Sequence, residues 1–182
     1  MKTAPATLIQ WDDTITSMVI ILSGPPGSGK STVGEALALK FPQSASFSTD
    51  TIRQFIKGGN IAPWEVGEKA EKQMKLGDDI VQDIMKRYIN SEYIVILDGI
   101  YGDEDIEKYK NLFGEVRGFL LLPSLDVLKE RDSSREESKR VPHRIEPLHE
   151  HFSSKQHQLF ETIDNSNQTV AETVDSIWKK LR

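Results

Sequence analysis

The stretch MVIILSGPPGSGKS, residues 18–31, decides the fold of this chain. Its first six residues form a continuous apolar run that is typical of a buried β-strand. GPPGSGKS, residues 24–31, matches the pattern G-x-x-x-x-G-K-[ST] of a phosphate-binding loop, and residues 30–41 continue with apolar side chains at helical spacing. A strand before this motif and a helix after it form the context in which the motif binds nucleotide phosphates. A chance Gly/Pro turn would not account for that context.

Each residue type in the loop has a physical role. Glycines let the backbone turn tightly, so that successive N–H groups point at a phosphate, and the following helix adds the positive end of its dipole. We expect Lys30 to reach the β- and γ-phosphates of ATP and the Ser31 hydroxyl to bind Mg²⁺. The residues predicted to contact the nucleotide are Gly24, Pro25, Pro26, Gly27, Ser28, Gly29, Lys30, Ser31 and Thr32.

Short apolar runs alternate with helical patterns along the rest of the chain. Further strands are predicted at residues 44–48, 93–97, 116–122 and 160–163, and helices at 51–56, 65–90, after Pro123 and at 169–181. Strands that alternate with helices imply a parallel sheet covered on both faces. The predicted fold class is therefore α/β, with three α/β/α layers around a five-stranded parallel sheet.

Composition limits the possible environments and partners. The 182 residues contain no cysteine, which excludes disulfides and thiolate metal ligands, and no run approaches the roughly 18 apolar residues of a membrane span. Together with the lack of a secretory signal, this predicts a cytoplasmic protein without a membrane partner. A net charge of −5 argues against nucleic acid. Residues 1–17 are predicted to be an N-terminal arm, and residues 18–182 the single domain.

A carboxylate and a guanidinium follow the second predicted strand, at Asp50 and Arg53. Ligands gather at the carboxyl ends of parallel strands, so both residues are expected near the phosphate-binding loop. Asp50 can accept the proton of an attacking hydroxyl, and Arg53 can bind a polar or anionic group of the substrate. The alternative is a helix cap followed by a solvated arginine. The phosphate-binding loop in the same chain favours the catalytic interpretation.

The third predicted strand ends in Asp98 and Gly99. A carboxylate at this place is a second ligand for Mg²⁺, whereas the alternative is an ordinary Asp-Gly turn. Tyr101 and Trp64 are candidates for the acceptor pocket, although core or surface packing is the simpler explanation for each.

The segment KERDSSREESKRVPHR, residues 129–144, concentrates arginines. Arg131 and Arg135 share one helix face and are the predicted catalytic arginines of a lid that closes on the triphosphate, with Arg140 a weaker candidate. The alternative is a solvated helix whose arginines pair with neighbouring Asp and Glu residues. The histidines lack the H-E-x-x-H zinc spacing. The segment 164–167 (DNSN) is either an adenine contact or a turn.

With these motifs in this order, residues 18–182 resemble the P-loop kinases. The chain is similar to the AAA-type P-loop phosphotransferases that include chloramphenicol phosphotransferase, zeta-toxin-like kinases and the kinase domain of polynucleotide kinase, and more distantly to gluconate and shikimate kinases. The resemblance implies a sheet order of 2-3-1-4-5, ATP with Mg²⁺, an acceptor carboxylate at Asp50 within a D-x-x-R arrangement with Arg53, and ATP-binding lid arginines at Arg131 and Arg135. Residues 57–90 match no member, so the acceptor stays open.

The predicted function is an ATP-dependent kinase that transfers the γ-phosphate to a hydroxyl of a small molecule, acting as a monomer or weak dimer. One alternative is a polynucleotide 5′-hydroxyl kinase, which needs a basic groove that an acidic chain with its arginines in a lid does not favour. The other is a nucleotide-dependent switch, which leaves Asp50 and Arg53 unexplained.

Overall fold

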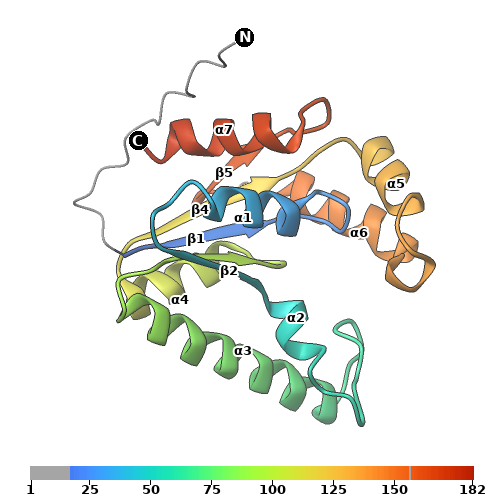
Figure 1. Ribbon diagram of the computed structural model, residues 1–182. Coiled ribbons are helices and arrows are strands. Elements are labelled where there is room, and N and C mark those ends of the chain that lie inside the picture. Colours follow the sequence, from blue (N-terminus) through green and yellow to red (C-terminus); the bar gives the residue numbers. More distant parts are fainter. Residues whose placement is uncertain (1–16, 156) are drawn as a thin grey trace.

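The computed structural model describes residues 17–155 and 157–182, so the predicted N-terminal arm lies outside the described residues except for Ser17. The described chain forms a five-stranded sheet in the order β2-β3-β1-β4-β5 with parallel neighbours (Figure 1), which confirms the predicted fold class and strand order. The strands are β1 (Val19–Ser23), β2 (Ser44–Ser48), β3 (Ile94–Asp98), β4 (Val116–Leu121) and β5 (Phe160–Ile163).

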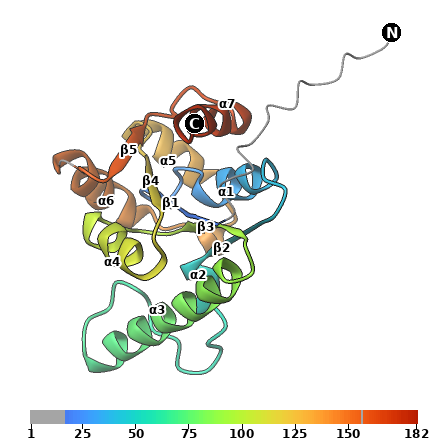
Figure 2. The same cartoon turned by 90° about the vertical axis from the view of Figure 1, so that its left-hand side faces the viewer.

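Helices connect the strands and cover both faces of the sheet. They are α1 (Lys30–Ala38), α2 (Thr49–Arg53), α3 (Glu68–Ile89), α4 (Asp103–Phe113), α5 (Leu125–Ser133), α6 (Pro142–Ser154) and α7 (Val170–Lys180), with the 3₁₀ turn η1 (Glu137–Lys139) between α5 and α6. Apolar side chains of α1 and α7 pack on one face, and those of α3, α4 and α6 pack on the other (Figure 2). Because both faces are covered, every residue of β1 and β3 is buried, as their continuous apolar sequences predict.

Two helices were not predicted from the sequence. In α4 the apolar residues Ile106, Tyr109 and Phe113 recur at helical spacing and pack against the core, a pattern that the sequence analysis did not use. The helix α6 begins with Pro142 and contains Pro147, which sequence reasoning treats as a helix breaker. Pro142 stands at the start of the helix, where a missing N–H has no cost, and it marks the boundary between the lid turn and α6.

The start of α2 also differs from the prediction. The helix begins at Thr49 rather than at residue 51, because the Ser48 side chain accepts a hydrogen bond from the Asp50 backbone N–H and caps it. Asp50 therefore lies in the first turn of α2 and is not the cap. This removes the capping role as an explanation for its carboxylate.

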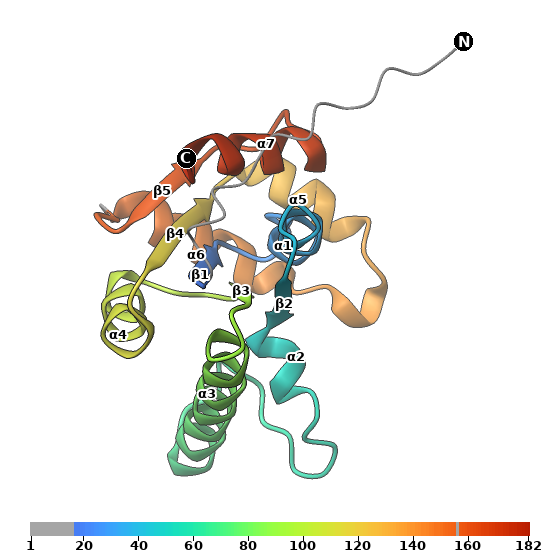
Figure 3. The ribbon, with the colours of Figure 1, turned by 60° about the vertical axis from the view of Figure 1, so that its left-hand side comes forward.

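The helices α2 and α3 project beyond the sheet together with their connection, residues 54–67 (Figure 3). Gln73 of α3 holds this connection, since its Oε1 accepts from the Ile61 N–H at 2.9 Å and its Nε2 donates to the Gly59 carbonyl at 2.5 Å. No helix in residues 17–155 and 157–182 is long and apolar enough to cross a membrane.

Candidate active site

The phosphate-binding loop joins β1 to α1 in a conformation that glycine makes possible. Gly24, Gly27 and Gly29 have φ values of 142°, 83° and 92°, a region that side chains disfavour. A Cβ at Gly24 would also lie 2.3 Å from the Leu121 carbonyl oxygen of β4. No side-chain cap binds the first turn of α1, so its N–H groups and the helix dipole are available to an anion.

Lys30 folds back over the loop. Its Nζ donates to the carbonyl oxygens of Gly24 at 2.7 Å and Pro25 at 2.9 Å. Burial lowers the pKa of Lys30 from 10.5 to about 8, although the carboxylates of Asp98 and Asp50 oppose this shift. Both carboxylates therefore lie close enough to act on the ammonium group. A negatively charged phosphate beside Lys30 would oppose the effect of burial and raise the pKa of Lys30, which favours the protonated amine.

Ser31 and Asp98 meet beneath the loop. The Ser31 hydroxyl donates to Asp98 Oδ1 at 3.0 Å, and Asp98 ends β3 in register with Leu22 of β1. Burial raises the pKa of the Asp98 carboxyl, against the hydrogen bond from Ser31. A hydroxyl and a carboxylate are hard oxygen ligands, and Mg²⁺ in phosphoryl-transfer sites takes one or two such ligands alongside phosphates. The pair fits the predicted Mg²⁺ site.

Ser31→Ala is therefore expected to raise the Mg²⁺ concentration needed for half-maximal ATP turnover by about tenfold, because one ligand is lost. Ser176→Ala is a matched control, because the Ser176 hydroxyl lies on the surface of α7 and donates to the Glu172 carbonyl of the same helix. A magnesium titration of both variants measures the effect. Identical curves would remove Ser31 from the metal site.

Asp50 and Arg53 lie on α2 at the carboxyl edge of the sheet. Asp50 is exposed, and neither side chain makes an ion pair within the described residues. Gly77 of α3 makes room for Arg53, because a Cβ at that glycine would lie 2.9 Å from Arg53 Cγ. The arrangement leaves a free carboxylate near Lys30 and a half-buried guanidinium beside α3, both available to a ligand.

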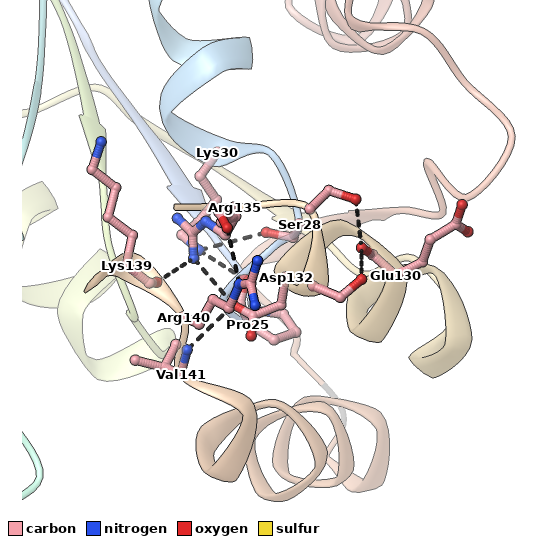
Figure 4. Close-up of polar contacts among 11 residues, drawn as sticks. Pro25, Ser28, Lys30, Glu130, Asp132, Arg135, Lys139, Arg140 and Val141 are labelled. Atoms are coloured by element: carbon pink, nitrogen blue, oxygen red, sulfur yellow. Dashed lines mark hydrogen bonds and ion pairs between the residues drawn. The ribbon is translucent and has the colours of Figure 1, made fainter. Parts of the chain in front are cut away.

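The lid arginines are held by polar contacts at the end of α5 and in the turn that follows (Figure 4). Arg135 Nη1 approaches Asp132 Oδ1 at 3.5 Å and the Lys139 carbonyl at 3.3 Å, and Arg140 Nε donates to the Arg135 carbonyl at 2.9 Å. Arg135 also contributes to the lowered pKa of Lys30, so its guanidinium lies close enough to act on that ammonium group. Arg135 thus pairs locally with Asp132, as the alternative of a solvated helix expects, and its charge also acts on Lys30 of the phosphate-binding loop.

Arg135→Ala is expected to raise the KM for ATP by about tenfold, the loss of one charged hydrogen bond, and to leave the acceptor KM within about twofold. Arg87→Ala, an exposed arginine of α3, is the control. Steady-state kinetics with each substrate varied in turn separates the two constants. An increase confined to the acceptor KM would place Arg135 on the other side of the cleft.

Asn165 and Asp132 are site residues whose roles sequence reasoning missed. Asn165 is 3% exposed, its Nδ2 donates to the Ser28 carbonyl at 3.0 Å, and its backbone carbonyl accepts from Arg131 Nη2 at 3.0 Å. It therefore ties the phosphate-binding loop to a lid arginine. Asp132 is 2% exposed and also accepts from the Val141 N–H, so it closes the base of the lid turn. The sequence offered the segment 164–167 as an adenine contact or a turn, and Asp132 as a local partner of the lid arginines.

The two aromatic candidates have different surroundings. Tyr101 is buried and its hydroxyl contacts that of Thr49, which fastens the end of β3 to the start of α2. Trp64, in the connection between α2 and α3, is 44% exposed and contacts α6. Two hollows of about 380 and 470 Å³ lie beside α3 and Tyr93, and the larger one follows β2 and reaches Ile52, between Asp50 and Arg53 on α2. No residue of the phosphate-binding loop lines either hollow.

The strand order, the glycine loop, the Ser31–Asp98 pair and the arginine-bearing turn define a P-loop kinase fold. The chain belongs to the family described as AAA domain, which matches residues 20–165. This confirms the resemblance to P-loop kinases that the sequence motifs indicate.

Nucleotide kinases share part of this sequence. A cytidylate kinase from Sulfurisphaera tokodaii is 29% identical over 106 residues, which cover 55% of this chain and 58% of that protein. An adenylate kinase from Zymomonas mobilis is 40% identical over 72 residues, which cover 40% of this chain and 30% of that protein. The chain thus spans little more than half of the first relative's length and under a third of the second's.

Solved structures share the whole fold at low identity. The tunicamycin resistance protein of Deinococcus radiodurans has a TM-score of 0.64 at 19% identity, covering 91% of this chain and 95% of that chain. The shikimate kinase of Acinetobacter baumannii has 0.63 at 18% identity, covering 93% and 95%. A gluconokinase from Sinorhizobium meliloti has 0.59 at 17%, covering 90% and 95%. At these identities the likeness establishes the fold.

Proposed function

We propose that the protein transfers the γ-phosphate of ATP to a hydroxyl group of a small molecule. The observation that carries this proposal is Asp50, an exposed carboxylate without an ion-pair partner in the described chain, close to the Lys30 ammonium. A phosphoryl group held by Lys30 would lie near this carboxylate. An alcohol loses its proton as it attacks, and a carboxylate at that place can accept or orient that proton.

Each side chain of the site has a separate role in the proposed reaction. Lys30 and the first-turn N–H groups of α1 would hold the β- and γ-phosphates, and Ser31 and Asp98 would hold Mg²⁺, which supplies charge neutralisation at the phosphate oxygens. The acceptor oxygen forms a bond to the γ-phosphorus, the bond from that phosphorus to the ADP oxygen breaks, and the acceptor proton passes to Asp50. Arg131 and Arg135 would stabilise the charge on the transferred phosphoryl group.

A second candidate is a nucleoside monophosphate kinase. The partial identity with cytidylate and adenylate kinases favours it, and the free guanidinium of Arg53 could bind a substrate phosphate. An attacking phosphate oxygen is already ionised near neutral pH, so this reaction needs no base. It therefore leaves the free Asp50 carboxylate unexplained, which is why we rank it second.

Two other functions rank below both candidates. The acidic net charge argues against a polynucleotide kinase, and a nucleotide-dependent switch leaves Asp50 and Arg53 unexplained.

An acceptor panel tests the proposal. Purified protein with Mg²⁺ and ATP is incubated with sugars, sugar acids, antibiotics, nucleosides, nucleoside monophosphates and 5′-hydroxyl oligonucleotides, and ADP release is followed. Stimulation by an alcohol, lost in Asp50→Asn, supports the proposed reaction. Stimulation by a nucleoside monophosphate that survives Asp50→Asn supports the second candidate instead. The domain bounds, the lid at residues 129–144 and the cytoplasmic location stay predictions.

A further inference from the structure

Arg144 differs from the other arginines of the lid segment. Arg131, Arg135 and Arg140 each donate to a named oxygen, as described above. The half-buried Arg144, in the first turn of α6, has no hydrogen-bonded or ion-paired guanidinium partner within residues 17–155 and 157–182. A cation in this position keeps its hydrogen-bonding capacity for another molecule.

The contact that Arg144 does make is with an aromatic ring. Its guanidinium carbon lies 5.7 Å from the centroid of the Trp64 ring, and the neighbouring His143 ring meets Trp64 edge-on at 5.3 Å. An aromatic face attracts a guanidinium without occupying its N–H donors. Trp64 can thus fix where the Arg144 side chain lies while its donors stay free.

Trp64 lies in the part of the chain that carries the candidate acceptor residues. It lies in the connection that follows Asp50 and Arg53 and that Gln73 of α3 pins by two hydrogen bonds. In Figure 1 this connection and the lid turn lie on the same side of the molecule. We call α2, α3 and their connection, residues 54–67, the acceptor lobe. The Trp64–Arg144 contact joins this lobe to α6, whereas Arg135 acts on Lys30 of the phosphate-binding loop.

We propose that the acceptor carries an anionic group, a carboxylate or a phosphate, that Arg144 binds, and that Trp64 is a positioning residue for Arg144. This inference rests on the proposed kinase function and narrows its substrate class. Arg53 of α2 is a second guanidinium that makes no ion pair within the described residues. Stacking on Trp64 orients Arg144 before the acceptor arrives, so less conformational freedom is lost on binding.

Kinetics with matched acceptors tests the proposal. Gluconate is compared with glucose, and CMP with cytidine, so that each pair differs by one anionic group. We expect the anionic member to be preferred and Arg144→Ala to raise its KM roughly 10- to 100-fold, the effect of a charged hydrogen bond, with the KM for ATP within about twofold. Trp64→Ala should raise the same KM about fivefold, and Trp64→Phe should restore it because the aromatic face returns. Arg87→Ala is the arginine control.

Three kinetic results would overturn the inference. Preference for the neutral member of both pairs would show that the acceptor needs no anionic group. A rise in the KM for ATP alone in Arg144→Ala assigns that residue to the nucleotide. An unchanged acceptor KM in both Arg144→Ala and Trp64→Ala would show that the contact between these two residues serves packing and not acceptor binding.

Trp64 fluorescence gives a binding test that needs no turnover. The signal of wild type minus that of Trp64→Phe is recorded while gluconate, glucose, CMP or cytidine is added with Mg²⁺ and a non-hydrolysable ATP analogue. We expect a change with an anionic member that its neutral partner does not give and that Arg144→Ala abolishes. Equal or absent responses within both pairs contradict the inference. Anion binding without phosphoryl transfer would reject the kinase proposal and preserve the anion site.

Discussion

Lys30→Ala is expected to lower the rate of phosphoryl transfer about 100- to 1,000-fold, the cost of removing one preorganised charge from the site of a transferred phosphate. Lys30 is the loop side chain that carries a positive charge, and its Nζ lies 2.7 Å from the Gly24 carbonyl oxygen. Binding of ATP would exchange these carbonyl contacts for phosphate contacts. The measurement is ADP production at saturating acceptor, together with the ATP dissociation constant.

Lys40→Ala is the matched control for this substitution. Lys40 is a surface lysine that pairs with Asp175 of α7 at 3.3 Å, where screening by solvent makes the pair weak. Thermal unfolding of both variants checks that the fold is retained, because Lys30→Ala also leaves the Gly24 and Pro25 carbonyls without their donor. A folded Lys30→Ala variant with wild-type turnover would refute the nucleotide role of the loop.

Asp50→Asn is expected to slow transfer to an alcohol by about 100- to 10,000-fold and to leave ATP affinity unchanged, because an amide keeps the shape of the side chain and cannot accept the proton. Asp79→Asn is the control, since Asp79 is an exposed carboxylate of α3 paired with Lys75 at 2.7 Å. Rapid-quench measurement of the first turnover isolates the chemical step.

Two other outcomes for Asp50→Asn would change the account. A large loss of ATP affinity would move Asp50 into the nucleotide site, which its proximity to Lys30 allows. A small effect with a nucleoside monophosphate as acceptor would favour the second candidate function. In that case the attacking group is already ionised, and Asp50 acts at most through its charge.

Local sequence determines the parts of this fold that could be predicted. The bounds of β2 and β5 agree with the prediction, and the phosphate-binding loop follows from glycine positions that need a positive φ. The helix α4 could have been predicted from the helical spacing of Ile106, Tyr109 and Phe113, whereas Pro147 inside α6 argued against a helix there. In α6 the buried residues Leu148 and Phe152 pack in the core on one face of the sheet, and that packing outweighs the local penalty of Pro147.

The parts of the site that could not be predicted depend on contacts between distant segments. Asn165 reaches Ser28 across 137 positions of the chain, and no local pattern distinguishes it from a turn residue. Asp132 looks like one of many charges in residues 129–144 until the lid turn buries it. Trp64 and Arg144 come from separate segments, so their contact has no signature in either one.

The most direct test of the central claim follows the label of γ-³²P-ATP in the presence of the acceptor panel. The account predicts that the label appears on an organic acceptor in wild type and in Lys40→Ala, and that it does not in Lys30→Ala. Release of all label as inorganic phosphate, at one rate with or without any acceptor, would contradict phosphotransfer and indicate a nucleotide-dependent switch.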